Sequence, residues 1–395
     1  MLRALVTAYL ALSTMKRFTP VLCVKPNVYT HGRMSSFALN PMILPPESEL
    51  RRAHIVPKKY RLEGYDDTYD FHTIAYDVVW MEQRKALLFV CPKLLNLETV
   101  FKASKIFADT SALPKPKIKR YRRHDEVWIK CPLKPSEVTL KFENLVLGVK
   151  PSSQNHEFDG KNVIMTKSKN NELVWISDWL SHHVHVQSAT AALIFDNGSD
   201  TYSVTDLQRT MNATTGLDIA VAVASDFAFG SWKATKLLHR SMFYQAGMLS
   251  VTRHRFLHSA RAVLPIDIDE MVCGANVFDA ARFSRIGYVT IPCAWRYSKL
   301  DDARRPSHQD HIWRCEPDAS CKEKYCLTPS RWFIDTVWDI HGLRRYAFNA
   351  LSKLNEARIH HCEHISNGWK RKRDAQQGKY LIVDAQTQRD FEHLN

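Results

Sequence analysis

The sequence lacks any hydrophobic run long enough to cross a membrane as a helix. The longest apolar stretch near the start, within residues 1–17, has about a dozen residues, whereas a spanning helix needs about 20. This stretch is similar to the core of a weak signal peptide, but no small-residue cleavage site follows it. We therefore expect any action at a membrane to be peripheral.

The nine cysteines lack the two-residue spacing of a zinc knuckle. A chain of 395 residues needs no disulfides to hold its core together, so we expect mostly reduced thiols and a cytoplasmic protein. One group, Cys315, Cys321 and Cys326, lies close in sequence to His308 and His311. A zinc site there stays open, beside the alternative of ordinary loop and core thiols.

The chain carries a formal net charge of +14. This excess indicates either acidic partners, such as nucleic acid, anionic membrane or a phosphorylated substrate, or a generally basic surface. Six of the nine residues in Lys115–Arg123 are cations. We expect this run to be a solvated loop or a contact for anionic lipid or an anionic acceptor. No recognised nucleic-acid-binding motif accompanies it, so no specific nucleic acid is expected.

Periodicity divides the chain into three regions. Residues 1–55 contain five prolines and little periodicity, which predicts a tail or loop. Residues 56–155 carry strand-like segments, which predict a small β-rich domain. Residues 160–395 alternate between predicted helices (172–186, 203–213, 233–252) and short apolar strands (190–195, 217–223, 262–267). This alternation predicts an α/β domain with a mostly parallel sheet. The segment 298–326, rich in Asp, Arg and Cys, is predicted to be an insertion or mobile loop.

Acidic residues follow each of the three predicted strands of the α/β domain. Asp196 and Asp200 follow the first, Asp226 the second, and Asp267 and Asp269 the third. Because ligands of open α/β sheets bind beyond the carboxyl ends of the strands, these acids mark a candidate site. Such a cluster is costly unless a cation or hydrogen-bond donors compensate it.

The Asp267-Ile-Asp269 motif predicts a divalent-cation site. In an extended chain, residues two apart lie on the same side, so the two carboxylates would face one hard cation, with a diphosphate supplying further oxygens. Pro265 comes just before the motif and removes a backbone donor. We therefore expect the strand to lose one pairing or to bulge at that point.

Several motifs in residues 165–375 resemble GT-A glycosyltransferases of the family 2-like and family 92-like (DUF23-type) kinds. The matching segments are Trp175–His183, Leu193–Asp200, Phe256–Glu270, Lys324-Tyr325, Asp339–Gly342, Arg358–Ser366 and Gly368–Arg371. The resemblance implies a GT-A-like domain that moves a sugar from a UDP- or GDP-sugar to a hydroxyl of a glycan or lipid-linked acceptor, with Mn²⁺ or Mg²⁺. It also implies surface polysaccharide or glycoconjugate synthesis, in the cytoplasm or peripherally at the inner membrane face.

The resemblance further implies roles in nucleotide binding. Asp196 and Asn197 would contact the uracil or ribose, and Asp200 and Asp226 would help to hold the nucleotide. Asp267 would face ribose or sugar hydroxyls.

For the metal, the resemblance implies ligation by Asp269 together with Asp267, and the cation would stabilise the diphosphate leaving group. A late histidine would complete the site, and the candidates are His341, His360, His361 and His364. Of these we favour His341 and His361.

The acceptor side is less defined by the sequence. An inverting reaction needs a carboxylate base near the acceptor hydroxyl, and Glu270, Asp335 and Asp339 are the candidates. Four late cations would either neutralise phosphate charge or form a solvated basic face: Arg344, Arg345, Lys370 and Arg371.

Two other functions stay open. A metal-dependent nucleotidyl or phosphoryl transferase, or a hydrolase, would use the same acids but predicts a glycine-rich or lysine-containing phosphate loop after the first strand. The turn at 196–200 reads Asp-Asn-Gly-Ser-Asp instead. A non-catalytic nucleic-acid or carbohydrate-binding protein is favoured only by the charge, and it gives no reason for acids at three strand ends.

Overall fold

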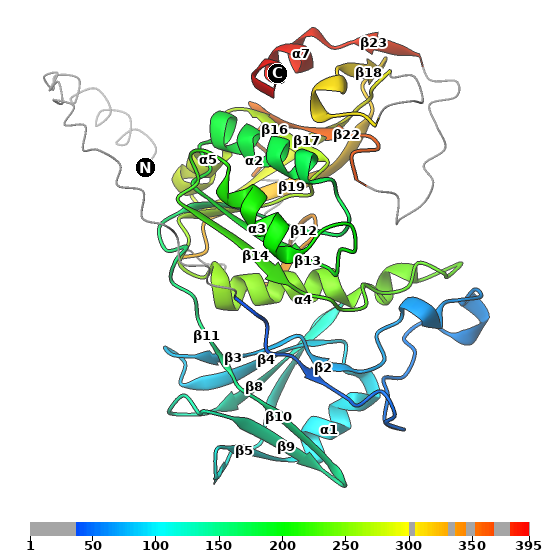
Figure 1. Cartoon of the computed structure of the whole chain (residues 1–395), viewed down its shortest axis with the longest axis vertical. Coiled ribbons are helices and arrows are strands. Elements are labelled where there is room, and N and C mark those ends of the chain that lie inside the picture. Colours follow the sequence, from blue (N-terminus) through cyan, green and yellow to red (C-terminus); the bar gives the residue numbers. More distant parts are fainter. Residues whose placement is uncertain (1–36, 300–304, 331–335, 345–351, 367–379, 395) are drawn as a thin grey trace, which may run out of the picture. The chain divides into compact units, whose positions relative to one another are not determined.

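The computed structural model describes residues 37–299, 305–330, 336–344, 352–366 and 380–394 (Figure 1). These residues belong to one compact unit and form a mixed α/β structure with several sheets, as the sequence predicts. None of the described helices is long and apolar enough to cross a bilayer. Four candidate residues from the sequence lie outside the described part: Asp335, Arg345, Lys370 and Arg371.

The β-rich region contains a five-stranded and a four-stranded sheet. The order of the first is β11 (Ser152–Ser153), β3 (Asp77–Met81), β4 (Ala86–Pro92), β8 (His124–Lys130) and β7 (Lys117–Arg120). The order of the second is β10 (Leu145–Val149), β9 (Val138–Phe142), β5 (Lys105–Ala108) and β6 (Ser111–Ala112), and α1 spans Glu98–Ala103. A further pair, β1 (Met42–Ile43) and β2 (Thr73–Ala75), draws part of the predicted tail into the fold.

The α/β region is built on an eight-stranded sheet. Its order is β14 (Ile219–Ala224), β13 (Ala191–Asp196), β12 (Asn162–Ser168), β15 (Ala262–Pro265), β19 (Ser320–Leu327), β17 (Tyr288–Arg296), β22 (Ala357–Cys362) and β16 (Glu270–Gly274). Four neighbouring pairs are parallel, namely β14–β13, β13–β12, β12–β15 and β17–β22, and the other three are antiparallel. Parallel pairing therefore predominates only slightly.

The helices and short strands of this region complete the fold. The helices are α2 (Leu173–Gln187), α3 (Val204–Asn212), α4 (Phe243–Val251), α5 (Val277–Phe283) and α7 (Ala385–Asp390). The short strands are β18 (Trp313–Cys315) paired with β23 (Leu381–Val383), and β20 (Trp338–Asp339) paired with β21 (Gly342–Leu343).

Helix α4 is buried along its whole length. All nine of its residues are buried, and it contacts β4, β8 and β20, as expected for a helix that is largely apolar all round. It continues as a π-helix over Thr252–Phe256, where Arg253 and His254 both reach Glu126 of β8, at 2.7 and 3.0 Å. Burial alone would raise the pKa of Glu126, but these neighbours hold it well below the usual value. A buried, charged network therefore ties α4 to the β-rich region.

Two predicted segments are wrong. Residues 320–327 are an interior strand, β19, although the sequence predicts an insertion or mobile loop over 298–326. The charged run Lys322-Glu323-Lys324 is typical of an exposed loop, so the sequence does not indicate a strand here. In the structure Lys324 is buried against carboxylates. The helix predicted over 233–252 begins only at Phe243.

Candidate functional site

The order of the parallel strands locates the candidate site. Strands β12, β13, β14 and β15 follow one another in the chain. In the sheet, β13 and then β14 lie on one side of β12, whereas β15 lies on its other side, so the strand order reverses at β12. Ligands of open α/β sheets bind beyond the carboxyl ends at such a reversal. A cavity open to solvent lies there, and its wall includes Lys167 near the end of β12, Asp267 after β15 and Lys324 of β19. Gln245 of α4 and Asp339 of β20 also line it.

Two lysines hold the carboxylate of Asp267. Lys167 Nζ lies 2.6 Å from Asp267 Oδ1, and Lys324 Nζ lies 2.7 Å from Asp267 Oδ2. Lys324 also lies 2.9 Å from Glu270 Oε2, and the side chains of both are almost fully buried. The lysines thus balance the charges of Asp267 and Glu270, as buried carboxylates require.

Burial and the opposite charge of the partner shift the pKa of Glu270, and likewise that of Lys324, in opposite directions. Burial raises the pKa of Glu270 above its usual value, the charges of Asp267 and Asp269 add to that effect, and Lys324 opposes it. Burial would lower the pKa of Lys324, yet Asp267 and Glu270 raise it above its usual value. Lys324 is therefore charged at any pH near neutrality.

The Asp267–Glu270 segment is a turn, so the extended geometry predicted from the sequence is wrong. The Glu270 amide donates to the Asp267 carbonyl at 3.1 Å, and the Asp267 amide donates to the Glu270 carboxylate at 3.0 Å. The strand ends at Pro265, and the apolar side chain of Ile268 is buried. Asp267 consequently faces the two lysines, whereas Asp269 contacts a different partner.

That partner is His361 of β22, whose Nε2 lies 3.2 Å from Asp269 Oδ2. A carboxylate and an imidazole are therefore brought together, as a mixed metal site requires. His341 lies instead on the side of Lys324 and Asp267. Although part of its surface is exposed, partial burial and then the charge of Lys324 lower the pKa of His341 to about 4, so it is neutral at pH 7.

The other two late histidines have carboxylate neighbours of their own. His360 Nε2 lies 3.0 Å from Asp390 Oδ2, and His364 Nε2 lies 3.7 Å from Glu363. Of the four late histidines, His361 is thus the one that contacts the Asp267–Glu270 turn at short range.

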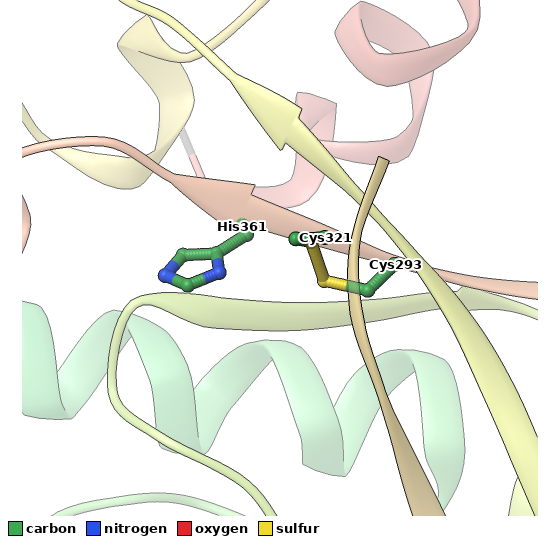
Figure 2. A group of neighbouring side chains, drawn as sticks. All are labelled: Cys293, Cys321 and His361. Atoms are coloured by element: carbon green, nitrogen blue, oxygen red, sulfur yellow. A yellow bond between two sulfur atoms is a disulfide. The ribbon is translucent and has the colours of Figure 1, made fainter. Parts of the chain in front are cut away.

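A disulfide lies beside His361 (Figure 2). It joins Cys293 of β17 to Cys321 of β19, which are directly paired in the sheet. The ring of His361 stacks on Trp295 of β17, with ring centroids 3.9 Å apart. Both sulfurs lie within 4.8 Å of a His361 nitrogen, but they are bonded to each other and so supply no thiolate ligand in this state.

The disulfide corrects two expectations from the sequence. The prediction of reduced thiols fails for Cys293 and Cys321, although six other described cysteines are free. The zinc alternative built on Cys315, Cys321 and Cys326 is wrong, because no metal-ligand group among the described residues contains these three together. The nearby histidines are used otherwise, since His308 and His311 each contact backbone carbonyl oxygens.

Removing the disulfide is expected to lower stability. It closes a loop with a sequence separation of 28 residues, so the loop-entropy relation gives a loss of about 3–4 kcal/mol in the free energy of unfolding for the C293S/C321S variant. Urea denaturation of the variant should match that of the reduced wild type, and C315S, which removes a free thiol, should leave the midpoint unchanged. Equal midpoints for oxidised wild type and the double variant would contradict the expectation.

Asp196 and Asn197 shape the turn after β13. The carboxylate of Asp196 accepts hydrogen bonds from the backbone amide and hydroxyl of Ser199, at 3.1 and 2.6 Å. The side-chain amide of Asn197 donates to the carbonyls of Ser225 and Phe227, both at 2.9 Å. The Asp196 bonds hold the turn after β13, and the Asn197 bonds join the carboxyl ends of β13 and β14, so both residues have a structural role whether or not they also contact a nucleotide.

The remaining two predicted nucleotide-binding acids lie at the same edge. Gly198 has a φ of +68°, and an added Cβ would lie 2.4 Å from Asp226 Oδ1, so glycine permits this close approach. Asp200 is exposed, and its backbone amide donates to Asn170 at 2.9 Å. Neither Asp200 nor Asp226 is among the residues that line the cavity. Their roles stay predictions.

The basic run Lys115–Arg123 reaches the cavity through its last residue. Arg123 forms an ion pair with Asp339, which lines the cavity from β20. Nearby, the guanidinium of Arg344 lies 5.7 Å from the ring centroid of Tyr121. Arg123, a positively charged residue of the β-rich region, therefore lies at one side of the candidate site.

Sequence reasoning missed the contributions of Lys167 and Lys324 to the site. Lys167 is the penultimate residue of β12, a strand that the sequence did not reveal because Asn162–Ser168 contains only three consecutive apolar residues. Lys324 was noted only within a matching motif. A lysine within two residues of a short apolar run, Val163–Met165 or Tyr325–Leu327, was the available signal in both places.

The comparisons with known proteins give no family for the chain. No protein-family model matches it, and no curated protein is similar to it.

Proposed function

We propose that this chain is a metal-dependent glycosyltransferase with a GT-A-like domain. It transfers a sugar from a UDP- or GDP-sugar to a hydroxyl of a glycan or lipid-linked acceptor. The observation that carries the proposal is the cavity at the strand-order reversal, bordered by two lysines and by Asp267, the first residue of the acidic turn that also holds Asp269 and Glu270. Nucleotides bind at this position in open α/β sheets.

Asp269 and His361 fit a divalent cation by the chemistry of their donor atoms. Manganese accepts carboxylate oxygen readily, and imidazole nitrogen is a common ligand of transition metals, so the pair favours Mn²⁺ over Mg²⁺. A bound cation would neutralise charge on the diphosphate leaving group. Asp267 acts differently in this proposal, because both its oxygens already contact lysines.

Lys167 and Lys324 suit the phosphate oxygens of the donor. Both ammonium groups reach the cavity wall, and both are held in place by Asp267. Charge-assisted hydrogen bonds from lysine to phosphate are strong in a partly buried site. The two residues therefore orient the diphosphate without a glycine-rich loop.

Asp339 is the better placed of the two described candidates for the base. It lines the cavity and its side chain is 34% exposed, whereas that of Glu270 is 2% exposed and paired with Lys324. A base must reach the acceptor hydroxyl directly or through one water. In this proposal Arg123 positions Asp339, and an acceptor carrying negative charge would meet the run Lys115–Arg123, at the inner face of a membrane or in the cytoplasm.

Calorimetric titration with a panel of UDP- and GDP-sugars tests the proposal. We expect one nucleotide class to bind with a Kd on the order of micromolar when Mn²⁺ is present and at least tenfold more weakly with a chelator. The released products should be the nucleoside diphosphate and free or transferred sugar. No binding and no turnover across the panel, with either Mn²⁺ or Mg²⁺, would show that the proposal is wrong.

The reaction product also distinguishes the proposed glycosyltransferase from the main alternative. A nucleotidyl or phosphoryl transferase or a hydrolase is favoured by the two lysines at the cavity, which suit phosphate in any such enzyme. Acting on a nucleotide sugar, it would cleave the diphosphate and release a nucleoside monophosphate and a sugar phosphate instead of a nucleoside diphosphate. Phosphorus NMR of the reaction mixture distinguishes these outcomes.

A further inference from the structure

A second group of ligand-type side chains lies at the connection between the β-rich and α/β regions. The segment 154–161 joins β11 to β12 and runs beside residues 255–261, which form the end of the π-helix and the residues after it. Three backbone hydrogen bonds join the two segments: Asn155 N–H to Arg255 O at 2.7 Å, Gly160 N–H to Ser259 O at 3.0 Å, and Arg261 N–H to Lys161 O at 2.9 Å. The backbone positions on either side of the group are therefore fixed.

Three side chains converge between these bonds. His156 Nδ1 lies 3.0 Å from Asp159 Oδ2, and the rings of His156 and His258 are nearly perpendicular, with centroids 5.1 Å apart. One donor atom from each of the three residues lies within 4.8 Å of the other two. These separations need only a small closure to become those of ligands around one tetrahedral ion.

His258 adds an independent observation. Its Nδ1 atom is buried and has no partner in good hydrogen-bond geometry, although the backbone of Arg255 lies near the ring. Buried polar atoms without a partner are rare, and each calls for an explanation such as an ion or a water.

We propose that His156, Asp159 and His258 form a zinc-binding site distinct from the candidate active site. Two imidazoles and one carboxylate are a common zinc ligand set, and a water would take the fourth position. The partial exposure of His156 and Asp159 gives an ion a path from solvent. Such nitrogen-rich sites favour Zn²⁺ over Mn²⁺ and Mg²⁺.

Binding of a zinc ion would link two segments of the fold. His156 and Asp159 belong to the segment that leads into β12, and His258 follows the π-helix that contacts β8 through Glu126. An ion shared by these two segments would tie the start of the large sheet to the helix that packs on the β-rich region. Zinc is therefore expected to raise the melting temperature, because it binds the folded chain preferentially.

Calorimetric titration of the whole, oxidised chain with Zn²⁺ alone tests the site. We expect one ion at this site with a Kd on the order of micromolar, separate from any ion at Asp269 and His361, and a melting temperature raised by about 3 °C at saturating zinc. H258Q and the exposed substitution D159N should each weaken binding at least about tenfold, since even changes outside the ligand shell cost 10- to 100-fold in metal sites.

A matched control is available at the surface. His54 Nε2 lies 2.7 Å from Asp66 in an exposed pair of the same kind, but no third ligand completes a metal-ligand group there among the described residues. H54Q should leave zinc affinity and stoichiometry unchanged, whereas D269N should remove only the zinc that binds at the candidate active site and should leave binding at His156, Asp159 and His258 intact. Unaltered binding in both H258Q and D159N would assign the zinc elsewhere, for example to Cys273, His360 and Asp390, and overturn the proposal. Absence of any zinc binding would overturn it too, whereas a failed nucleotide titration would not.

Discussion

Replacing Lys324 with methionine is expected to lower the free energy of unfolding by about 3–5 kcal/mol, the usual cost of removing one partner from a buried ion pair. The methionine fills nearly the same volume, but Glu270 keeps a buried carboxylate without its counter-charge, and Asp267 keeps only Lys167. Urea denaturation at pH 7 measures the loss. It tests the site's electrostatics whatever reaction the site performs.

The pH dependence of this loss has a definite sign. Burial already raises the pKa of Glu270 above 4.5 in the folded protein, and removing Lys324 removes the charge that most opposes this rise. A carboxyl with a raised folded pKa contributes stability at low pH and loses it as the pH rises through that folded pKa. The deficit of K324M should therefore be full at neutral pH and shrink as the pH falls toward 4.5.

Lys322 provides the control for Lys324. It lies two residues earlier on β19 and is exposed, so K322M should change stability by no more than about 0.5 kcal/mol. The double variant K324M/E270Q should recover part of the loss, because it removes the unpaired charge. Equal effects of K322M and K324M would contradict the ion-pair account.

Replacing Asp269 with asparagine is expected to lower kcat/KM for the nucleotide sugar about 1000-fold, equivalent to about 4 kcal/mol of transition-state stabilisation. The asparagine keeps the shape of the side chain and its backbone contact with Cys362, but removes the charge that faces His361. Raising the Mn²⁺ concentration should restore part of the activity. H361Q should act in the same direction, because it removes the nitrogen partner.

Asp218 is a matched control for this substitution. It is exposed, it pairs with Lys161 on the solvent side, and it precedes β14 at the edge of the sheet away from the cavity. D218N should leave kcat/KM within about twofold and metal dependence unchanged. If D269N kept wild-type kinetics at limiting Mn²⁺, Asp269 would have no role in metal binding, and the proposed reaction would lose its main support.

Local patterns in the sequence predict the elements that are amphipathic or continuously apolar. The helix predicted over 172–186 is α2, and the strands predicted over 190–195 and 217–223 are β13 and β14, shifted by one or two residues. Turn chemistry at 196–200 is also local, because Asp196 and Ser199 bond within the turn. Such features depend on residues close in sequence, so periodicity and turn residues are sufficient to find them.

Strands that carry buried charge were not predictable in the same way. Lys167 and Lys324 read as surface residues in the sequence and so obscure β12 and β19. Each is acceptable inside the fold only because a carboxylate from a distant segment, Asp267, lies within 2.7 Å. A lone buried lysine would be too costly, and its partner is invisible to any local window.

The sequence by itself determined the mixed α/β class and the gathering of acids at the ends of three parallel strands. Only the tertiary structure decided how the acids divide, with Asp267 between two lysines and Asp269 against His361. The reason is physical: strand periodicity sets which residues reach an edge of the sheet, whereas the order of strands and the turn at 267–270 set which charges meet there. Strand order depends on contacts between segments far apart in the chain, and these contacts leave no regular spacing in the sequence.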